Sequence, residues 1–137
     1  MTKTFSGGCS CGAIRYETEA DALAMVKCHC RDCQRAGGSG YAPAIALPAA
    51  SVKITGAPRY YKTVGDAGKG IERGFCPNCG SQILLKFERM PNMLGIQAAS
   101  LDDPSLFEPK VDLFTSSAWA WDPISPATEH HTHGMFD

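Results

Sequence analysis

The seven cysteines of this chain fall into three tight clusters. The clusters contain Cys9 with Cys11, Cys28 with Cys30 and Cys33, and Cys76 with Cys79. Sulfurs one or two residues apart share one turn of backbone and can converge on a single ion, whereas such close neighbours make strained disulfides. An odd number of cysteines would also leave one thiol unpaired. The spacing therefore predicts thiolate metal sites, with zinc as the first choice of ion.

The two outer pairs predict one structural site. Cys76-Pro-Asn-Cys79-Gly80 has the form of a metal knuckle, in which Gly80 permits the backbone conformation needed after the second sulfur. With Cys9 and Cys11 it completes the set of four thiolates that is usual for structural zinc. The ion would join two distant parts of a small fold. The weaker alternatives are iron in the same set, as in rubredoxin-like sites, and a redox dithiol at Cys76 and Cys79.

The middle cluster predicts a site of another kind. Cys28, Cys30 and Cys33 offer three thiolates and no fourth cysteine, and three protein ligands with one open position are typical of catalytic zinc. Three thiolates on Zn²⁺ leave a charge of −1, and an incoming thiolate would add to it. Nearby cations should therefore matter.

Several side chains around the middle cluster have competing interpretations. The candidate cations are Lys27, Arg31 and Arg35, which could equally be solvated surface charges. His29 lies between two candidate ligands and should point away from a metal that they share. His130, His131 and His133 could supply a further ligand, although a loose C-terminus is the favoured interpretation. Aromatic residues that could line a pocket, or simply belong to the core, are Tyr41, Tyr60, Tyr61, Phe114, Trp119 and Trp121.

The segments between the clusters resemble short strands that end at Gly or Pro. We expect strands at 13–19, 41–47, 52–55, 59–62, 71–75, 82–87, 93–98 and 110–115. This spacing predicts a mainly β, mainly antiparallel domain. The one predicted helix runs over 31–36 and is closed by Gly37 and Gly38. Residues 101–105 predict a turn, and the glycine-rich segment 64–70 is the predicted flexible loop.

Length and composition limit the possible roles. A chain of 137 residues predicts a single domain over 1–137. The net charge is −1 and there is no strongly basic run, so nucleic acid and anionic membranes are not the expected partners. Free clustered thiols and an N-terminal stretch without an apolar signal region predict a cytoplasmic location. The oligomeric state does not follow from the sequence.

Three stretches carry a family resemblance. They are Gly8-Cys-Ser-Cys-Gly-Ala-Ile-Arg-Tyr16, Cys28-His-Cys-Arg-Asp-Cys-Gln-Arg-Ala-Gly-Gly-Ser39 and Arg73-Gly-Phe-Cys-Pro-Asn-Cys-Gly-Ser81. With the weaker stretches 99–104 and 119–123, the chain resembles the glutathione-dependent formaldehyde-activating enzyme family, which includes the centromere protein V type. One departure is visible: where similar chains tend to show Pro-x-Val-His-Ile, this chain has Asp112.

The resemblance implies a β-tent fold of short antiparallel sheets stabilised by zinc. It implies a structural zinc on Cys9, Cys11, Cys76 and Cys79, and a catalytic zinc on Cys28, Cys30 and Cys33. The implied activity is that of a carbon–sulfur lyase of the S-(hydroxymethyl)glutathione synthase type, which adds glutathione to formaldehyde. Asp112 stands where similar chains tend to have a histidine, which puts in question whether this chain catalyses the same reaction as its family.

Two hypotheses about function follow. The first is an enzyme that adds glutathione or a related small thiol to formaldehyde or another small aldehyde, with Arg31 or Ser39 stabilising the developing alkoxide. The second is a zinc-stabilised binding module without turnover, because a fold does not fix a function. The sequence does not distinguish among thiol and aldehyde substrates.

Overall fold

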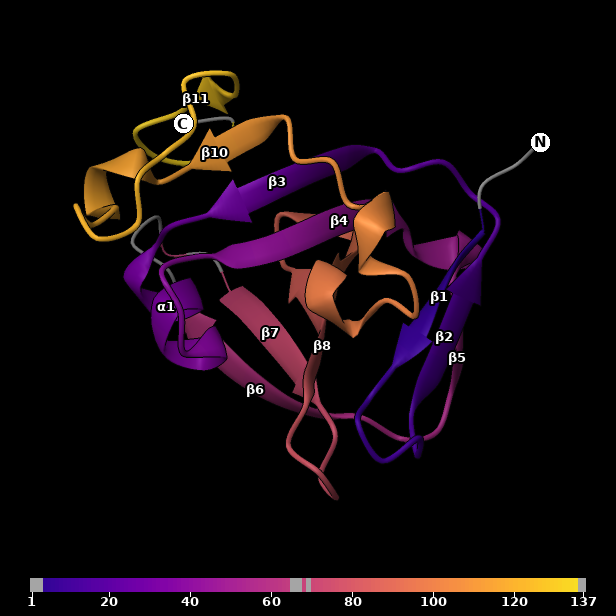
Figure 1. Ribbon diagram of the computed structural model, residues 1–137. Helices are drawn as coiled ribbons and strands as arrows, with labels where there is room; N and C mark the ends of the chain where they lie inside the picture. Colours follow the sequence, from indigo (N-terminus) through magenta and orange to yellow (C-terminus); the bar gives the residue numbers. More distant parts are fainter. Residues whose placement is uncertain (1–3, 65–67, 69, 136–137) are drawn as a thin grey trace.

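The computed structural model describes residues 4–64, 68 and 70–135, and these residues are mainly β (Figure 1). Their strands form two sheets, one of three strands and one of eight. The predicted β class is therefore confirmed. The predicted flexible loop at 64–70 lies largely outside the described residues. No helix among the described residues combines the length and the apolar character needed to cross a membrane.

The smaller sheet is fully antiparallel and has the order β1-β2-β5. Its strands are β1 (Phe5–Gly8), β2 (Arg15–Thr18) and β5 (Lys53–Thr55). Alternate residues of β2 are buried, and Tyr16 and Thr18 point to the interior. This period of two is expected of a strand with one face on a core.

The larger sheet has the order β11-β10-β3-β4-β9-β8-β7-β6. Its strands are β3 (Ala24–Cys28), β4 (Ala42–Pro48), β6 (Arg59–Val64), β7 (Gly70–Phe75), β8 (Gln82–Phe87), β9 (Met90–Gln97), β10 (Val111–Leu113) and β11 (Glu129–His130). Strands β1, β3 and β11 were not predicted, whereas each predicted strand overlaps an observed one.

The expectation of antiparallel sheets needs one correction. Strand β10 pairs in parallel with both β3 and β11, while the other pairs are antiparallel. After β9, the chain crosses the molecule through two 3₁₀ turns, η2 (Ala98–Ser100) and η3 (Pro104–Leu106). A long connection of this kind lets β10 reach the edge of β3 in the same direction, which a tight hairpin would not allow.

The single α-helix among the described residues is α1 (Arg31–Gly37). Cys30 is its N-cap and Gly38 its C-cap, so the prediction of a helix over 31–36 is confirmed to within one residue. Two further 3₁₀ turns are η1 (Ala49–Ser51) and η4 (Thr115–Ser117).

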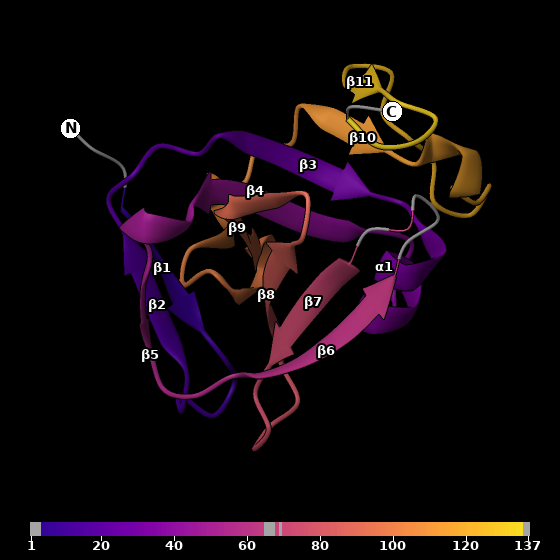
Figure 2. The ribbon, with the colours of Figure 1, turned by 180° about the vertical axis from the view of Figure 1, so that it is seen from behind.

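Both sheets contribute to one core. Figures 1 and 2 show the smaller sheet standing at one side of the molecule and α1 at the other, beside the ends of β3 and β6. The fully buried side chains of this core include Phe5, Ile14, Tyr16, Ile45, Leu47, Ile83, Leu84 and Ile96. Burial of such a cluster is the main force that holds the two sheets together.

Candidate functional site

The outer cysteine pairs meet although they are far apart in the sequence. Cys9 and Cys11 lie on the turn between β1 and β2, and Cys76 and Cys79 on the turn between β7 and β8. The four Sγ atoms lie within 4.8 Å of one another, and all four thiols are free. The Sγ atoms of Cys9 and Cys11 are 3.6 Å apart, and those of Cys11 and Cys76 are 3.8 Å apart.

These separations fit a shared ion better than disulfides. A tetrahedral ion with bonds of about 2.3 Å to sulfur places its sulfurs about 3.8 Å apart. A disulfide would need about 2.05 Å. The four-cysteine set could therefore hold a metal ion that links the smaller sheet to the larger one.

Backbone N–H groups surround the sulfurs of this set. Ile14 N donates to Cys9 Sγ at 3.2 Å, and Asn78 N donates to Cys76 Sγ at 3.4 Å. Gly80 has a φ of +80°, as expected for the residue after the second sulfur, and its N–H donates to Cys76 O. Donors of this kind stabilise the negative charge of a thiolate.

The four-cysteine set lies at the surface. Cys9 and Cys76 are buried, whereas Cys11 and Cys79 are exposed. The hydroxyl of Ser81, followed by its backbone, lowers the pKa of Cys79 to about 5. Ser81 Oγ also accepts from Ser10 N at 3.0 Å, so it ties the two turns to each other.

The middle cluster is also brought together, and its three sulfurs come from one continuous stretch. Cys28 ends β3, Cys30 caps α1, and Cys33 lies in the first turn of α1. Their Sγ atoms lie within 4.8 Å of one another, and no further Cys, His, Asp or Glu of the described residues joins this group. Three donors with one side left for another ligand are the arrangement of a metal centre that can bind a substrate.

The three sulfurs share charge unequally. Hydrogen bonds from Cys28 and Cys33 lower the pKa of Cys30, whereas hydrogen bonds with Cys30 and Cys33 raise the pKa of Cys28. Cys33 N also donates to Cys30 Sγ at 3.3 Å. Cys30 is thus the sulfur of this cluster that most readily carries a negative charge.

A buried arginine that sequence reasoning missed contacts the middle cluster. Arg73 lies in β7, and its Nη2 is 3.5 Å from Cys33 Sγ. The sequence offered two signals: Arg73 is a charged residue inside a predicted strand, and it begins the stretch around Cys76 that carries the family resemblance. The contact itself depends on how β7 packs against α1, which no motif specifies.

The predicted cations lie elsewhere. Lys27 Nζ is 3.9 Å from Asp112 Oδ1 and 4.6 Å from the centre of the Tyr41 ring. Arg31 donates to Gln34 Oε1, and its guanidinium lies 5.6 Å from the ring of Trp119. Arg35 is exposed on α1.

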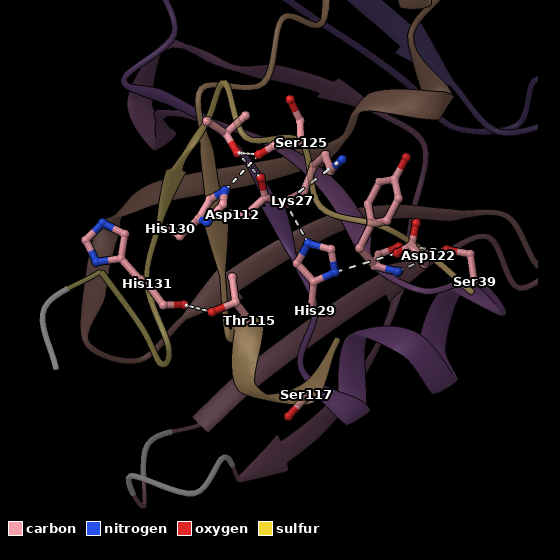
Figure 3. Close-up of polar contacts among 12 residues, drawn as sticks. Lys27, His29, Ser39, Asp112, Thr115, Ser117, Asp122, Ser125, His130 and His131 are labelled. Carbon is pink, nitrogen blue, oxygen red and sulfur yellow. Dashed lines mark hydrogen bonds and ion pairs between the residues drawn. The ribbon is translucent and has the colours of Figure 1, made fainter. Parts of the chain in front are cut away.

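His29 does not join the sulfur group, as expected, and its buried ring lies between Asp112 and Asp122 (Figure 3). Its Nε2 is 2.6 Å from Asp112 Oδ1, and its Nδ1 is 3.7 Å from Asp122 Oδ2. Asp112 is fully buried and also accepts a hydrogen bond from Thr128 Oγ1. Burial alone would raise the pKa of Asp112, but the hydrogen bonds from Thr128 and His29 outweigh it and lower the pKa.

This pocket around His29 gives Asp112 a set of buried partners. The side chain of Asp112 contacts His29, Thr128 and Lys27, and none of these is a cysteine. Its partner His29 lies between Cys28 and Cys30 in the sequence, so Asp112 is joined to the turn that carries these two cysteines. His29 N also donates to Leu113 O at 2.9 Å, which fixes the same turn against β10.

The other candidate residues are distributed around the site. Ser39 Oγ donates to Tyr41 O at 2.7 Å, and Trp119 Nε1 donates to Gln34 Oε1 at 2.9 Å. Trp121 and Tyr61 are exposed.

The tail histidines have partners of their own. His130 Nε2 lies 2.8 Å from Ser125 O, and His131 Nε2 lies 2.7 Å from Glu129 Oε2. The ring of His133 packs against the ring of Phe114, with the centroids 6.2 Å apart. None of the three histidines belongs to the group of ligands at the middle cluster among the described residues.

Known proteins are similar to this chain in sequence and in fold. A Halomonas elongata protein named "Putative glutathione-dependent formaldehyde-activating enzyme" is 29% identical over 101 residues, which cover 70% of this chain and 64% of that protein. This chain therefore spans less than two thirds of that relative. The crystal structure of a Rhodobacter sphaeroides protein matches with a TM-score of 0.59 and 25% identity, and covers 76% of this chain and 96% of the other.

The family model gives the widest coverage of the sequence. The model described as glutathione-dependent formaldehyde-activating enzyme matches residues 4–117, which contain all seven cysteines and Arg73. The match thus includes both sulfur clusters that the fold assembles. This chain belongs to the glutathione-dependent formaldehyde-activating enzyme family.

Proposed function

We propose that this protein is a zinc-dependent carbon–sulfur lyase of the S-(hydroxymethyl)glutathione synthase type. It would join glutathione, or a related small thiol, to formaldehyde or another small aldehyde. In that reaction the sulfur forms a bond to the carbonyl carbon, the C=O π bond breaks, and the oxygen takes up the proton that the sulfur loses. The reverse reaction releases the same aldehyde and thiol.

The observation that carries this proposal is the three-sulfur cluster in a member of this family. Cys28, Cys30 and Cys33 offer soft, negatively charged donors, which suit zinc. Zinc at such a site supplies a Lewis acid that lowers the pKa of a thiol and keeps it nucleophilic near neutral pH. The four-cysteine set, by contrast, is proposed to hold a structural zinc that ties the two sheets into the expected β-tent.

The chain's own residues would position the reactants. Cys28 and Cys33 are held by β3 and α1, so the open side of the cluster keeps a fixed direction. Arg31 is our candidate for stabilising the developing alkoxide, because it is exposed next to Cys30 and is steadied by Trp119. Ser39 is the second candidate, and its hydroxyl would first have to break its hydrogen bond to Tyr41 O.

Asp112 is compatible with this proposal. Its buried contacts with His29 and Thr128 support a role in shaping the turn that carries Cys28 and Cys30. We therefore propose that the replacement at this position keeps the sulfur cluster intact, and that the family reaction is retained. The seven free thiols suit a reducing compartment, so the proposed location is the cytoplasm.

The test is exchange NMR with purified protein, glutathione and ¹³C-formaldehyde. We expect exchange between free formaldehyde and its glutathione adduct to accelerate in proportion to protein concentration. Cys30→Ser is the control, because it removes one donor of the middle cluster and leaves the four-cysteine set unchanged. An exchange rate equal to the spontaneous rate at every protein concentration, in a protein that retains its metal, would instead favour a binding module without turnover.

A further inference from the structure

The surroundings of Arg73 pose a problem of charge. The side chain is only 5% exposed, and its Nη1 donates to Thr63 Oγ1 at 2.8 Å while Nη2 faces Cys33 Sγ at 3.5 Å. A buried guanidinium is costly unless an anion pairs with it. No carboxylate of the described residues forms an ion pair with Arg73. The anion that this arginine faces is therefore the sulfur cluster.

The sulfur cluster has the complementary problem. Three thiolates around a divalent ion carry a net charge of −1, and a thiolate substrate as a fourth ligand would make it −2. The cations predicted from the sequence do not lie against these sulfurs: Lys27 faces Asp112, and Arg31 faces Gln34 and Trp119. Arg73 is the cation whose N–H reaches a sulfur of this cluster among the described residues.

Arg73 also connects the cluster with the surface. It lines a hollow of about 500 Å³ together with Asp32, Arg35, Tyr61 and Thr63. One guanidinium thus borders both a sulfur of the cluster and this hollow. The hollow has two arginines and one carboxylate, that of Asp32, among its lining residues, and none of the three cysteines.

We propose that Arg73 is the charge partner of the three-cysteine centre, and that it sets the affinity of this centre for a divalent ion and for an anionic fourth ligand. The inference rests on the proposed occupation of the centre by a metal. Thr63 is the positioning residue, because it holds the other guanidinium nitrogen and so directs Nη2 at Cys33. The fork geometry explains why arginine is used here, since one lysine ammonium would not span both partners as well.

The experiment uses cadmium, whose ¹¹³Cd resonance separates the two sites of one molecule. The full-length protein is loaded with ¹¹³Cd²⁺ and titrated with a competing chelator, which gives an affinity for each site. The variants are Arg73→Met, Arg73→Lys and Thr63→Val. Arg59→Met is the matched control, because Arg59 is an exposed arginine on the neighbouring strand β6. The four-cysteine signal reports in every sample whether the fold is intact.

We expect Arg73→Met to weaken cadmium binding at the middle site by about 10- to 100-fold, the usual range for a partner of a metal ligand. Arg73→Lys should recover part of this loss because it keeps the charge, and Thr63→Val should cause a smaller loss. Arg59→Met should change neither site. Addition of glutathione should shift the middle resonance in the wild type at lower concentration than in Arg73→Met.

Two results would overturn the inference. One is an unchanged affinity of the middle site in Arg73→Met, and the other is an equal loss at both sites, which would reduce Arg73 to a general stabilising role. A wild-type protein that binds a single cadmium ion would instead overturn the proposed metal centre, and the inference with it. Normal cadmium binding without accelerated exchange would refute the proposed activity and leave Arg73 as the charge partner.

Discussion

The two cysteine clusters use the same atoms for different structural purposes. The four-cysteine set takes its donors from two turns. Cys11 and Cys76 are 65 positions apart in the sequence, although their sulfurs lie only 3.8 Å from each other. The three-cysteine set takes its donors from one stretch of six residues, from Cys28 to Cys33. An ion in the first set closes a long loop of chain, whereas an ion in the second closes almost none.

This difference separates stability from chemistry. Closing a long loop removes much conformational freedom from the unfolded chain, so an ion in the four-cysteine set should contribute strongly to folding. An ion in the three-cysteine set would close only a short loop and would therefore contribute little to folding in this way. Its turn is already held by α1, by His29 and by Gln34, whose Nε2 donates to His29 O at 2.7 Å. Its incomplete set of donors instead suits the proposed binding of a substrate.

The largest expected effect is that of breaking the four-cysteine set. Cys76→Ser removes a fully buried donor, and structural zinc in small peptides binds with about 10–16 kcal/mol, which is comparable to the whole stability of a domain. We expect this variant to lose its cooperative thermal unfolding transition in circular dichroism. A melting curve like that of the wild type would show that the two turns hold together without an ion.

The matched change in the three-cysteine set should have the opposite profile. Cys30→Ser should keep the fold and the metal of the four-cysteine set, while glutathione–formaldehyde exchange falls by about 100-fold or more, because the remaining two thiolates no longer define the centre. Metal analysis and exchange NMR on one sample measure both quantities. Unfolding of this variant, or unchanged exchange, would remove the distinction between the two clusters.

The support behind the three-cysteine turn can be tested at Asp112. Asp112→Ala leaves His29 and Thr128 without their buried hydrogen-bond partner, and a buried polar group left unsatisfied costs about 1–3 kcal/mol. Urea denaturation should show this loss in the free energy of unfolding. The matched control is Asp32→Ala, which changes a half-buried acidic residue of α1 that forms no ion pair among the described residues. Equal denaturation midpoints for the two variants would contradict a supporting role of Asp112.

The smallest effect is expected from an ion pair that also connects the smaller sheet to the segment after β9. The guanidinium of Arg15 contacts both carboxylate oxygens of Asp102, at 2.9 and 2.5 Å, and together with Ser6 it lowers the pKa of Asp102. Both side chains are nearly half exposed, so solvent screens the pair.

Because the folded pKa of Asp102 is lowered, this contribution is present above the unfolded value of about 3.9 and is lost as the pH falls through the folded pKa. Asp102→Asn should therefore lower the melting temperature slightly at pH 7, and this difference should shrink as the pH is lowered towards the folded pKa of Asp102. The difference should also shrink in 1 M salt, because the Debye length falls from about 10 Å at 0.1 M to about 3 Å and the pair is screened more strongly. A difference that persists at low pH would mean that Asp102 acts through something other than its charge.

The sequence predicted the parts of this molecule that depend on local spacing. The sulfur clusters, the helix after Cys30 and most strands follow from ligand spacing, caps and alternation, which act over a few residues. Strand β1 was missed because Phe5-Ser-Gly-Gly8 has little strand character. Gly7 is required there for close approach, since a side chain would meet Ser100 O and the Tyr16 hydroxyl within 2.4 Å.

Contacts between distant segments were beyond the reach of those rules. Arg73 reaches Cys33 across 40 positions, and Asp112 reaches His29 across 83. Both contacts depend on which strands become neighbours in the larger sheet, and one of these pairings is the parallel one between β3 and β10. The charge requirement of the middle cluster could be stated from its cysteines, whereas the residue that meets it required the fold.

We claim that the four-cysteine set holds an ion needed for folding and the three-cysteine set an ion that is not. Stepwise removal of metal from gently purified protein tests this claim most directly. Native mass spectrometry counts the bound ions as a chelator is added, and circular dichroism follows the fold in the same titration. We predict two zinc ions per chain, of which the first leaves with the fold intact and the second leaves as the chain unfolds. A protein without metal, cysteines joined in disulfides, or loss of both ions in a single step would contradict the account.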